Sequence, residues 1–317
     1  MKKFLISFST ISFLLLLLVF PTISLKGAKT GLMLWFQTVL PTLLPFMIVS
    51  NLIMQLNVTD CLTSFFYPTL GRLLGLSKPG CYPFLIGMLS GYPVGAKACA
   101  DLIASGQISK DEGQYLLCFC NNASPMFIIS FVAMQCLNIK HKPFIILGIV
   151  YGSALLTGIV YRILHRKALQ AVKLTNSKLT VVPYSSKPAR VPAFDILDQT
   201  ILNAFTILVK VGGYIILFSI LAEIVLHITF IPETFRYFLI GFLEITTGSA
   251  AISFAQFSFT KKIILTNALT AFGGLSSHAQ TYSVIIHSGL SIKNYFLFKC
   301  INAGIAGLCT LLFVSVI

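Results

Sequence analysis

Charged residues are scarce in this sequence, and acidic residues most of all. Of its 317 residues, 10% are Asp, Glu, Lys or Arg, only nine are acidic, and 56% are hydrophobic. A soluble domain has about 25% charged residues, because its surface must face water. The scarcity excludes a soluble globule of this size. It predicts an all-α polytopic membrane protein, a bundle whose outer surface faces the lipid of the cell membrane.

Metal-site and disulfide patterns are also missing. Most of the eight cysteines lie inside apolar runs, where cysteine behaves as a small hydrophobic residue. Cys118 and Cys120 are separated by one residue, and no second Cys/His pair follows at the spacing of a zinc site. We expect no disulfide framework, no metal site and no cofactor, while a coupling ion, H⁺ or Na⁺, stays open.

The net charge of +14 does not indicate nucleic-acid binding. The Lys and Arg residues collect in short gaps between apolar runs, as the positive-inside rule expects, and no basic stripe or nucleic-acid-binding module is present. From Arg162 to Arg190 the chain has seven Lys or Arg, no acidic residue, and prolines that oppose a continuous helix. We therefore predict a basic cytoplasmic linker at 165–195 and a cytoplasmic N-terminus.

Nine apolar segments are each about long enough to cross a hydrocarbon core of about 30 Å as a helix. The first follows Met1-Lys2-Lys3 and could be a signal peptide, but no A-x-A-like cleavage site follows it, so we expect a retained transmembrane helix at 1–26. Some segments carry few polar side chains, whereas others are interrupted by Gly, Pro, Asn, Ser, Thr or charge. The uninterrupted segments are 4–25, 143–164, 205–230 and 294–317, the interrupted ones are 84–104, 115–138, 236–257 and 263–286, and the ninth segment is 31–56.

A short repeat relates the two halves of the chain. Phe84-Leu85-Ile86-Gly87 recurs 154 residues later as Phe238-Leu239-Ile240-Gly241. Each copy is followed by a polar stretch that contains glycine, then by an interrupted helix, then by an uninterrupted one. With the basic linker in the cytoplasm and the segments at 84–104 and 236–257 as re-entrant hairpins, the halves are inverted, as in many secondary transporters.

The repeats define the predicted domain organisation. The first repeat, 27–164, contains a helix, a hairpin, a broken helix and a closing helix, and the second repeat, 196–317, contains the same four elements in the same order. The predicted elements are the hairpin 84–104, the broken helix 115–138 and the helix 143–164 in the first repeat, and the helix 205–230, the hairpin 236–257, the broken helix 263–286 and the helix 294–317 in the second.

Broken helices at membrane depth leave backbone N–H and C=O groups unpaired, which is tolerated only beside protein or a water-filled cavity. Freed helix N-termini attract anions, and freed carbonyls can hold a cation. Glycine and proline could instead serve only close packing or kinks, but four interruptions in matched pairs favour a substrate site. The predicted substrate-binding residues are Ser90, Gly91, Tyr92, Pro93, Gly95, Lys97, Asn121, Asn122, Ser124, Glu244, Thr246, Thr247, Gly248, Ser249, Gly274, Ser276, Ser277, His278 and Gln280.

Three ionisable residues in these segments each have functional and purely structural interpretations. Lys97 could point a cation at an anionic substrate or form an i,i+4 pair with Asp101. Glu244 could carry a coupling proton, help to bind Na⁺, or only hydrogen-bond the hairpin. His278 could relay a proton or bind substrate, or it could be a packing histidine.

The stretch Ser90-Gly91-Tyr92-Pro93-Val94-Gly95-Ala96-Lys97 resembles the sporulation integral membrane protein YlbJ family, whose members carry a Gate, or nucleoside-recognition-like, domain. The resemblance covers roughly residues 27–317. It implies a fold similar to concentrative nucleoside transporters, with two hairpins and two unwound helices around a central site. It also implies a role in sporulation, in which dipicolinic acid moves out of the mother cell. Supporting stretches are 31–36, 40–46, 121–125 and 273–276.

These observations favour a membrane transporter of a small anionic solute, with dipicolinic acid as the candidate, that works by alternating access. A nucleoside or another small solute is the alternative, as is a sporulation membrane protein that transports nothing. We expect no enzymatic activity, because neither Ser90 nor Ser276-Ser277-His278 lies in a G-x-S-x-G setting. The expected partners are the solute and the lipid bilayer, not nucleic acid, and a homo-oligomer stays open.

Overall fold

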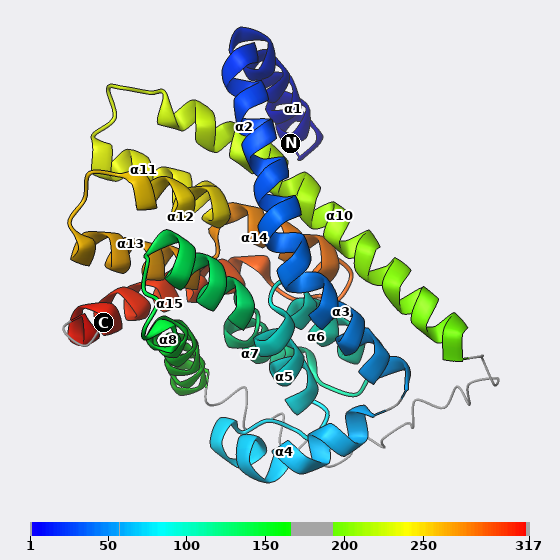
Figure 1. The fold of residues 1–317 in the computed structure, drawn as a ribbon. Coiled ribbons are helices and arrows are strands. Elements are labelled where there is room, and N and C mark those ends of the chain that lie inside the picture. The colour runs from blue at the N-terminus through cyan, green and yellow to red at the C-terminus, as the bar shows by residue number, and fades with distance from the viewer. Residues whose placement is uncertain (1, 57, 166–192, 315–317) are drawn as a thin grey trace.

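The part of the chain that the structure describes consists of helices joined by turns and short extended segments (Figure 1). The structure is a computed structural model and describes residues 2–56, 58–165 and 193–314. No strand occurs among these residues, so the predicted all-α fold class is confirmed. Four helical stretches are long and apolar enough to cross a membrane, namely 21–53, 143–164, 194–226 and 292–313. The chain is therefore an all-α polytopic membrane protein.

Two long helical stretches pack against each other as antiparallel partners. One is α2 (Pro21–Leu34), continued by the π-helix η1 (Trp35–Val39) and by α3 (Leu40–Gln55), and the other is α10 (Ala193–Leu226). Gly27 lets α2 approach α10 closely, since a Cβ added there would lie 2.8 Å from the Ile220 Cα. Further along, the indole of Trp35 donates a hydrogen bond of 3.0 Å to the Leu208 carbonyl. Such close backbone approach at small residues is typical of helix pairs in membranes.

A helical hairpin lies at each place where the sequence predicts one. The first consists of α5 (Cys81–Ser90) and α6 (Val94–Ala104), and the second of α11 (Glu233–Leu243) and α12 (Ile245–Phe254). Each helix is about 15 Å long at 1.5 Å per residue, about half the thickness of a bilayer core. No single arm can therefore cross the membrane, which is the geometry that a re-entrant hairpin requires.

Each hairpin is followed by an interrupted helix and then by an uninterrupted one. In the first half these are α7 (Lys110–Cys120), the π-helix η2 (Phe127–Cys136) and α8 (Pro143–Leu164). In the second half they are α13 (Phe259–Phe272), α14 (Gly274–Ile285) and α15 (Ile292–Phe313). α7 begins five residues before the predicted start at 115, because the Ser109 side chain caps it by accepting a hydrogen bond from the Glu112 amide.

Three other regions can be compared with the sequence prediction, and one of them contains a helix that was not predicted. α1 (Lys2–Val19) occupies the predicted first helix. The predicted linker at 165–195 falls mostly on 166–192, outside the described residues, and α10 begins within its range at Ala193. No helix was expected at α4 (Thr59–Leu74), which contains Pro68 and mixes polar with apolar residues. Its exposed Phe65 and Leu73 suit a short helix that lies at a membrane surface.

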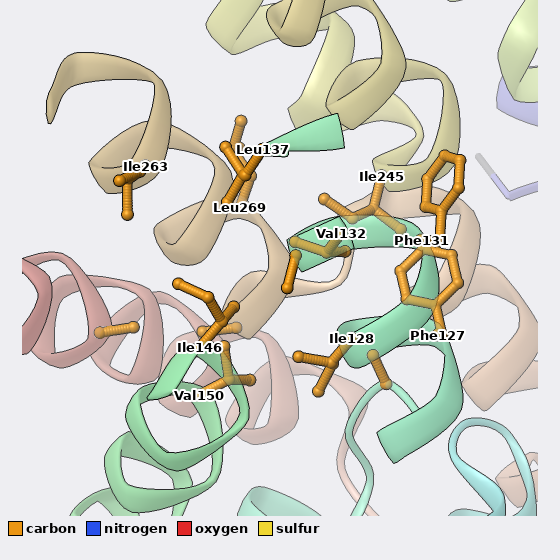
Figure 2. Packing of buried hydrophobic residues seen from close by; sticks show 14 of the residues in the cluster. Phe127, Ile128, Phe131, Val132, Leu137, Ile146, Val150, Ile245, Ile263 and Leu269 are labelled. Atoms are coloured by element: carbon orange, nitrogen blue, oxygen red, sulfur yellow. The ribbon is translucent and has the colours of Figure 1, made fainter. Parts of the chain in front are cut away.

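The largest apolar cluster joins the two halves around η2 (Figure 2). Phe127, Ile128 and Val132 of η2 lie between α8 on one side and the second half on the other. Ile245, the first residue of α12, and Leu269 of α13 complete the cluster from the second half. The broken segments of both halves therefore share one core.

Candidate functional site

The tip of the first hairpin packs on the first helix break. Gly91 has φ of +81°, and a Cβ added there would lie 2.8 Å from the Ser124 nitrogen. Tyr92, the next residue, donates its backbone N–H to the Asn122 carbonyl over 2.8 Å. Only glycine fits a left-handed turn in such close contact. The residues from Gly91 to Pro93 therefore cover the extended segment between α7 and η2.

The tip of the second hairpin packs on the second helix break in the same way. The break is the left-handed pair Gly273 (φ +92°) and Gly274 (φ +76°), which separates α13 from α14. A Cβ added at Gly274 would lie 3.0 Å from the Ile245 nitrogen. Since Glu244 and Ile245 form the tip of the second hairpin, the hairpin tip of each half packs on the helix break of the same half. We call each such pair a tip–break unit.

The two tip–break units meet at a cavity. A Cβ added at Gly273, in the second break, would lie 3.6 Å from Cε1 of Tyr92, in the first tip. The empty space of the cavity is about 400 Å³, but it is so narrow that it holds only about one or two water molecules. Its apolar walls come from η1, α3, η2 and α10, and its polar lining from the broken segments: Tyr92, Ser124, Glu244, Thr246, Ser276, Ser277 and Gln280.

Glu244 is the only acidic residue in this lining. It is 1% exposed, and its Oε2 accepts a hydrogen bond of 2.6 Å from the Thr247 backbone N–H. The carboxylate therefore caps α12, where a negative charge interacts favourably with the helix dipole. Glu244 thus makes a hydrogen bond within the second hairpin, which was one of its predicted roles. The same side chain also faces the cavity.

The N-terminus of α14 faces the cavity without a side-chain cap. Gly273 lines the cavity at the N-cap position and has no side chain that could accept from the first-turn amides. Ser277 donates its hydroxyl to the Gly274 carbonyl over 3.0 Å, and Gln280 donates its amide to the Ser276 hydroxyl over 3.2 Å. The Gln280 Oε1 is buried and has no hydrogen-bond partner within the described structure. A bound solute could donate to this oxygen and accept from the first turn of α14.

Lys97 does not line the cavity. Its Nζ lies 2.7 Å from Asp101 Oδ2, and the two side chains are 42% and 45% exposed. The i,i+4 pair that the spacing allowed is therefore formed, and a substrate role for Lys97 stays a prediction. His278 is also absent from the lining, stacks on Phe272, and places Nδ1 2.8 Å from the Gly274 carbonyl, while its Nε2 is buried without a partner.

The other predicted site residues do not line the cavity. Gly95 provides close packing inside the first hairpin, because a Cβ added there would lie 2.8 Å from the Gly87 Cα. Gly248 does the same in the second hairpin against Gly241. The Thr247 hydroxyl lies 2.7 Å from the Ser219 hydroxyl of α10. The remaining residues are buried: Ser90, Pro93, Asn121, Asn122 and Ser249.

Sequence reasoning missed the side chains that pair the freed backbone carbonyls. Tyr151 of α8 donates its hydroxyl to the Met88 and Ala123 carbonyls.

Two residues of α15 do the same for other freed carbonyls. Asn302 donates to the Ala271 carbonyl over 3.0 Å, and Lys299 donates to the Asn121 carbonyl over 3.3 Å. The uninterrupted helices thus satisfy the breaks, as backbone at membrane depth requires. The signal for Lys299 was an ionisable residue inside an apolar span.

The chain is similar to the sporulation integral membrane protein YlbJ of Bacillus subtilis (strain 168). The two sequences are 27% identical over an alignment of 321 residues, gaps included, which covers 92% of this chain and 78% of the relative. No protein-family model matches the chain. No solved structure matches it either. The similarity confirms the resemblance to YlbJ that residues 90–97 suggested, and with the apolar helices it confirms a membrane location.

Proposed function

Since the chain is a relative of the sporulation integral membrane protein YlbJ, we propose that it is a multi-pass transporter of a small solute in sporulating cells. The solute binds in the cavity between the two tip–break units, which widens from the narrow form described above to admit it. Transport proceeds by alternating access, in which the tips and breaks move against the long helices α2–α3 and α10. The protein is not an enzyme in this proposal, because Ser277 and His278 both contact the Gly274 carbonyl and form no nucleophile–base pair with each other.

One observation carries the proposal. Seven polar side chains, contributed by two hairpin tips and two helix breaks, converge on one buried cavity. Six of the seven residues are at most 3% exposed, so they are kept away from both water and lipid. Buried polar groups of this kind are costly in a membrane unless they serve packing or binding. A scaffold would not need them around an empty space, whereas a solute pathway does.

An anionic solute, with dipicolinic acid as the candidate, is the first choice. The uncapped N-terminus of α14 has the positive end of the helix dipole, and its first-turn amides can bind a carboxylate. Dipicolinate carries two carboxylates on a small aromatic ring, and the apolar walls offered by Val211 and Ile215 suit the ring.

A nucleoside is the second choice, and Glu244 favours it. A carboxylate in the lining opposes an anion but accepts hydrogen bonds from sugar hydroxyls. The unpartnered Gln280 oxygen would accept another. The two choices therefore differ in which of two neighbouring groups dominates binding, the first-turn amides of α14 or the carboxylate of Glu244 beside them.

Uptake into proteoliposomes tests the proposal. The purified full chain is reconstituted, and the uptake of radiolabelled dipicolinate and uridine is measured with and without an excess of the other unlabelled compound. We expect saturable uptake of one of them. Gln280→Ala should lower the uptake about threefold to tenfold, because a single hydrogen bond contributes about 0.5–1.5 kcal/mol. Gln256→Ala, at an exposed glutamine outside the cavity, is the matched control and should leave uptake unchanged.

Two results would contradict the proposed function. If neither compound is taken up in a saturable way, the proposed solute classes are wrong. If Gln280→Ala transports like the wild type, the solute does not bind in this cavity.

A further inference from the structure

Lys299 is a lysine buried inside a membrane-spanning helix. It is 1% exposed and lies on α15, which is long and apolar enough to cross a membrane. At 1.5 Å per residue, Lys299 lies about 10 Å along a helix of about 33 Å, well inside the hydrocarbon core. Ionisable residues at such depth are costly, and they usually mark functional sites with a specific partner.

The partners of Lys299 are neutral oxygens of the first helix break. Its Nζ lies 3.0 Å from the Asn122 Oδ1 and 3.3 Å from the Asn121 carbonyl oxygen. The ion pairs found among the described residues involve Lys26, Lys97 and His227 instead. The Asn121 carbonyl is free to accept because α7 ends at Cys120, so that no next turn of helix follows.

The two oxygens are held in place by other elements. The Asn122 amide nitrogen donates to the Phe119 carbonyl over 2.7 Å, which turns its oxygen towards Lys299. Asn121 donates to Thr281 of α14 and to the Tyr295 hydroxyl of α15, and it accepts from the Ala96 amide of α6. The first break is thus tied to the first hairpin, to α14 and to α15 at one point, and Lys299 provides the positive charge there.

A carbonyl and an amide oxygen at an unwound helix end are the kind of ligands with which transporters bind Na⁺. We propose that the Lys299 ammonium occupies a monovalent-cation site at the first helix break and takes the place of a bound metal ion. It holds the break, the first hairpin and α14 together permanently, where a metal ion would do so only while bound. Transport is then independent of Na⁺, and this last consequence rests on the transport function proposed above.

Thermal unfolding tests the cation site without any transport measurement. The purified full chain in detergent is melted in NaCl, LiCl, KCl or choline chloride at equal ionic strength. The wild type should melt at the same temperature in all four salts. Lys299→Ala opens the site, so it should melt several degrees lower in choline chloride and should be stabilised selectively by Na⁺ or Li⁺, because a ligand that binds only the folded state raises its stability.

Two further variants separate the charge from the space. Lys299→Met fills the space without a charge, so it should be destabilised and should not respond to any cation. Lys97→Ala removes an exposed lysine that pairs with Asp101, and it should show no selective cation response. The proposal is overturned if Na⁺ selectively stabilises the wild type, if Lys299→Met is as stable as the wild type, or if folded Lys299→Ala responds to none of the cations.

The transport consequence has its own readout. Uptake into proteoliposomes should proceed at the same rate when choline replaces Na⁺ on both sides, and a rate that depends on Na⁺ would contradict it. If no tested solute is taken up at all, the proposed function fails, while the melting experiment still decides whether Lys299 occupies a cation site.

Discussion

At the scale of single residues, Glu244 combines a structural and a functional position. It caps α12 through the Thr247 amide and also lines the cavity. Glu244→Gln keeps an acceptor for the cap but removes the charge. We expect this variant to melt within about two degrees of the wild type, because the capping bond is retained. Solute uptake should change at least threefold: it should rise if the solute is an anion and fall if the solute donates hydroxyls to the carboxylate.

Ser258 provides the matched control for the cap. Its hydroxyl accepts from the Lys261 amide at the start of α13, on the exposed surface and away from the cavity. Loss of an N-cap costs about 1 kcal/mol wherever it occurs. Ser258→Ala should therefore lower the melting temperature slightly and leave uptake unchanged. Equal uptake by Glu244→Gln and the wild type would remove Glu244 from the solute site.

At the scale of elements, the hairpins depend on glycines at their closest approach. A Cβ added at Gly248 would lie 2.7 Å from the Gly241 backbone nitrogen, and neither backbone can give way. Gly248→Ala should therefore destabilise the second hairpin by about 1–3 kcal/mol. Gly304→Ala on α15 is the control, because a Cβ there meets nothing within 4 Å. Melting temperatures in detergent give the comparison, and equal temperatures for both variants would contradict the packing.

At the scale of the whole molecule, the inverted halves that the sequence predicts imply that the two hairpins enter the membrane from opposite sides. Ala104 is an exposed residue at the base of the first hairpin, and Gln256 is an exposed residue at the base of the second. In a background with the exposed Cys61 and Cys300 replaced by serine, Gln256→Cys should react with a membrane-impermeant maleimide on intact cells. Ala104→Cys should react only after the cells are permeabilised. Reaction of both from the same side would rule out inverted halves.

Much of the element order was predictable, and particular residues show why. The repeat ending at Gly87 and Gly241 predicted two hairpins, and both glycines lie where the hairpin arms approach each other most closely. α8 spans Pro143–Leu164, with the predicted bounds, because a long apolar run has one favourable structure in lipid, a membrane-spanning helix. α4 was missed, because a helix that mixes polar and apolar residues and contains proline has no such run.

The site was predictable in its location and less so in its residues. Glu244, Ser276 and Gln280 lie in interrupted segments and line the cavity, as breaks at membrane depth suggest. Lys97 was singled out for its charge, yet it pairs with Asp101 at the surface of α6. Lys299 was not singled out, although it is buried against the first helix break. Sequence spacing shows which residues share an element, but not which way each side chain points.

The sequence by itself determined the class of the protein and the positions of its breaks. Scarce charge and long apolar runs require lipid as the surrounding solvent, and glycine, proline and asparagine at membrane depth interrupt helices wherever they are placed. Only the tertiary structure decided which groups meet. The Asn121 carbonyl and the Lys299 ammonium are 178 residues apart in the chain. They become partners because a broken helix must find hydrogen bonds outside itself, and its neighbours in space alone can supply them.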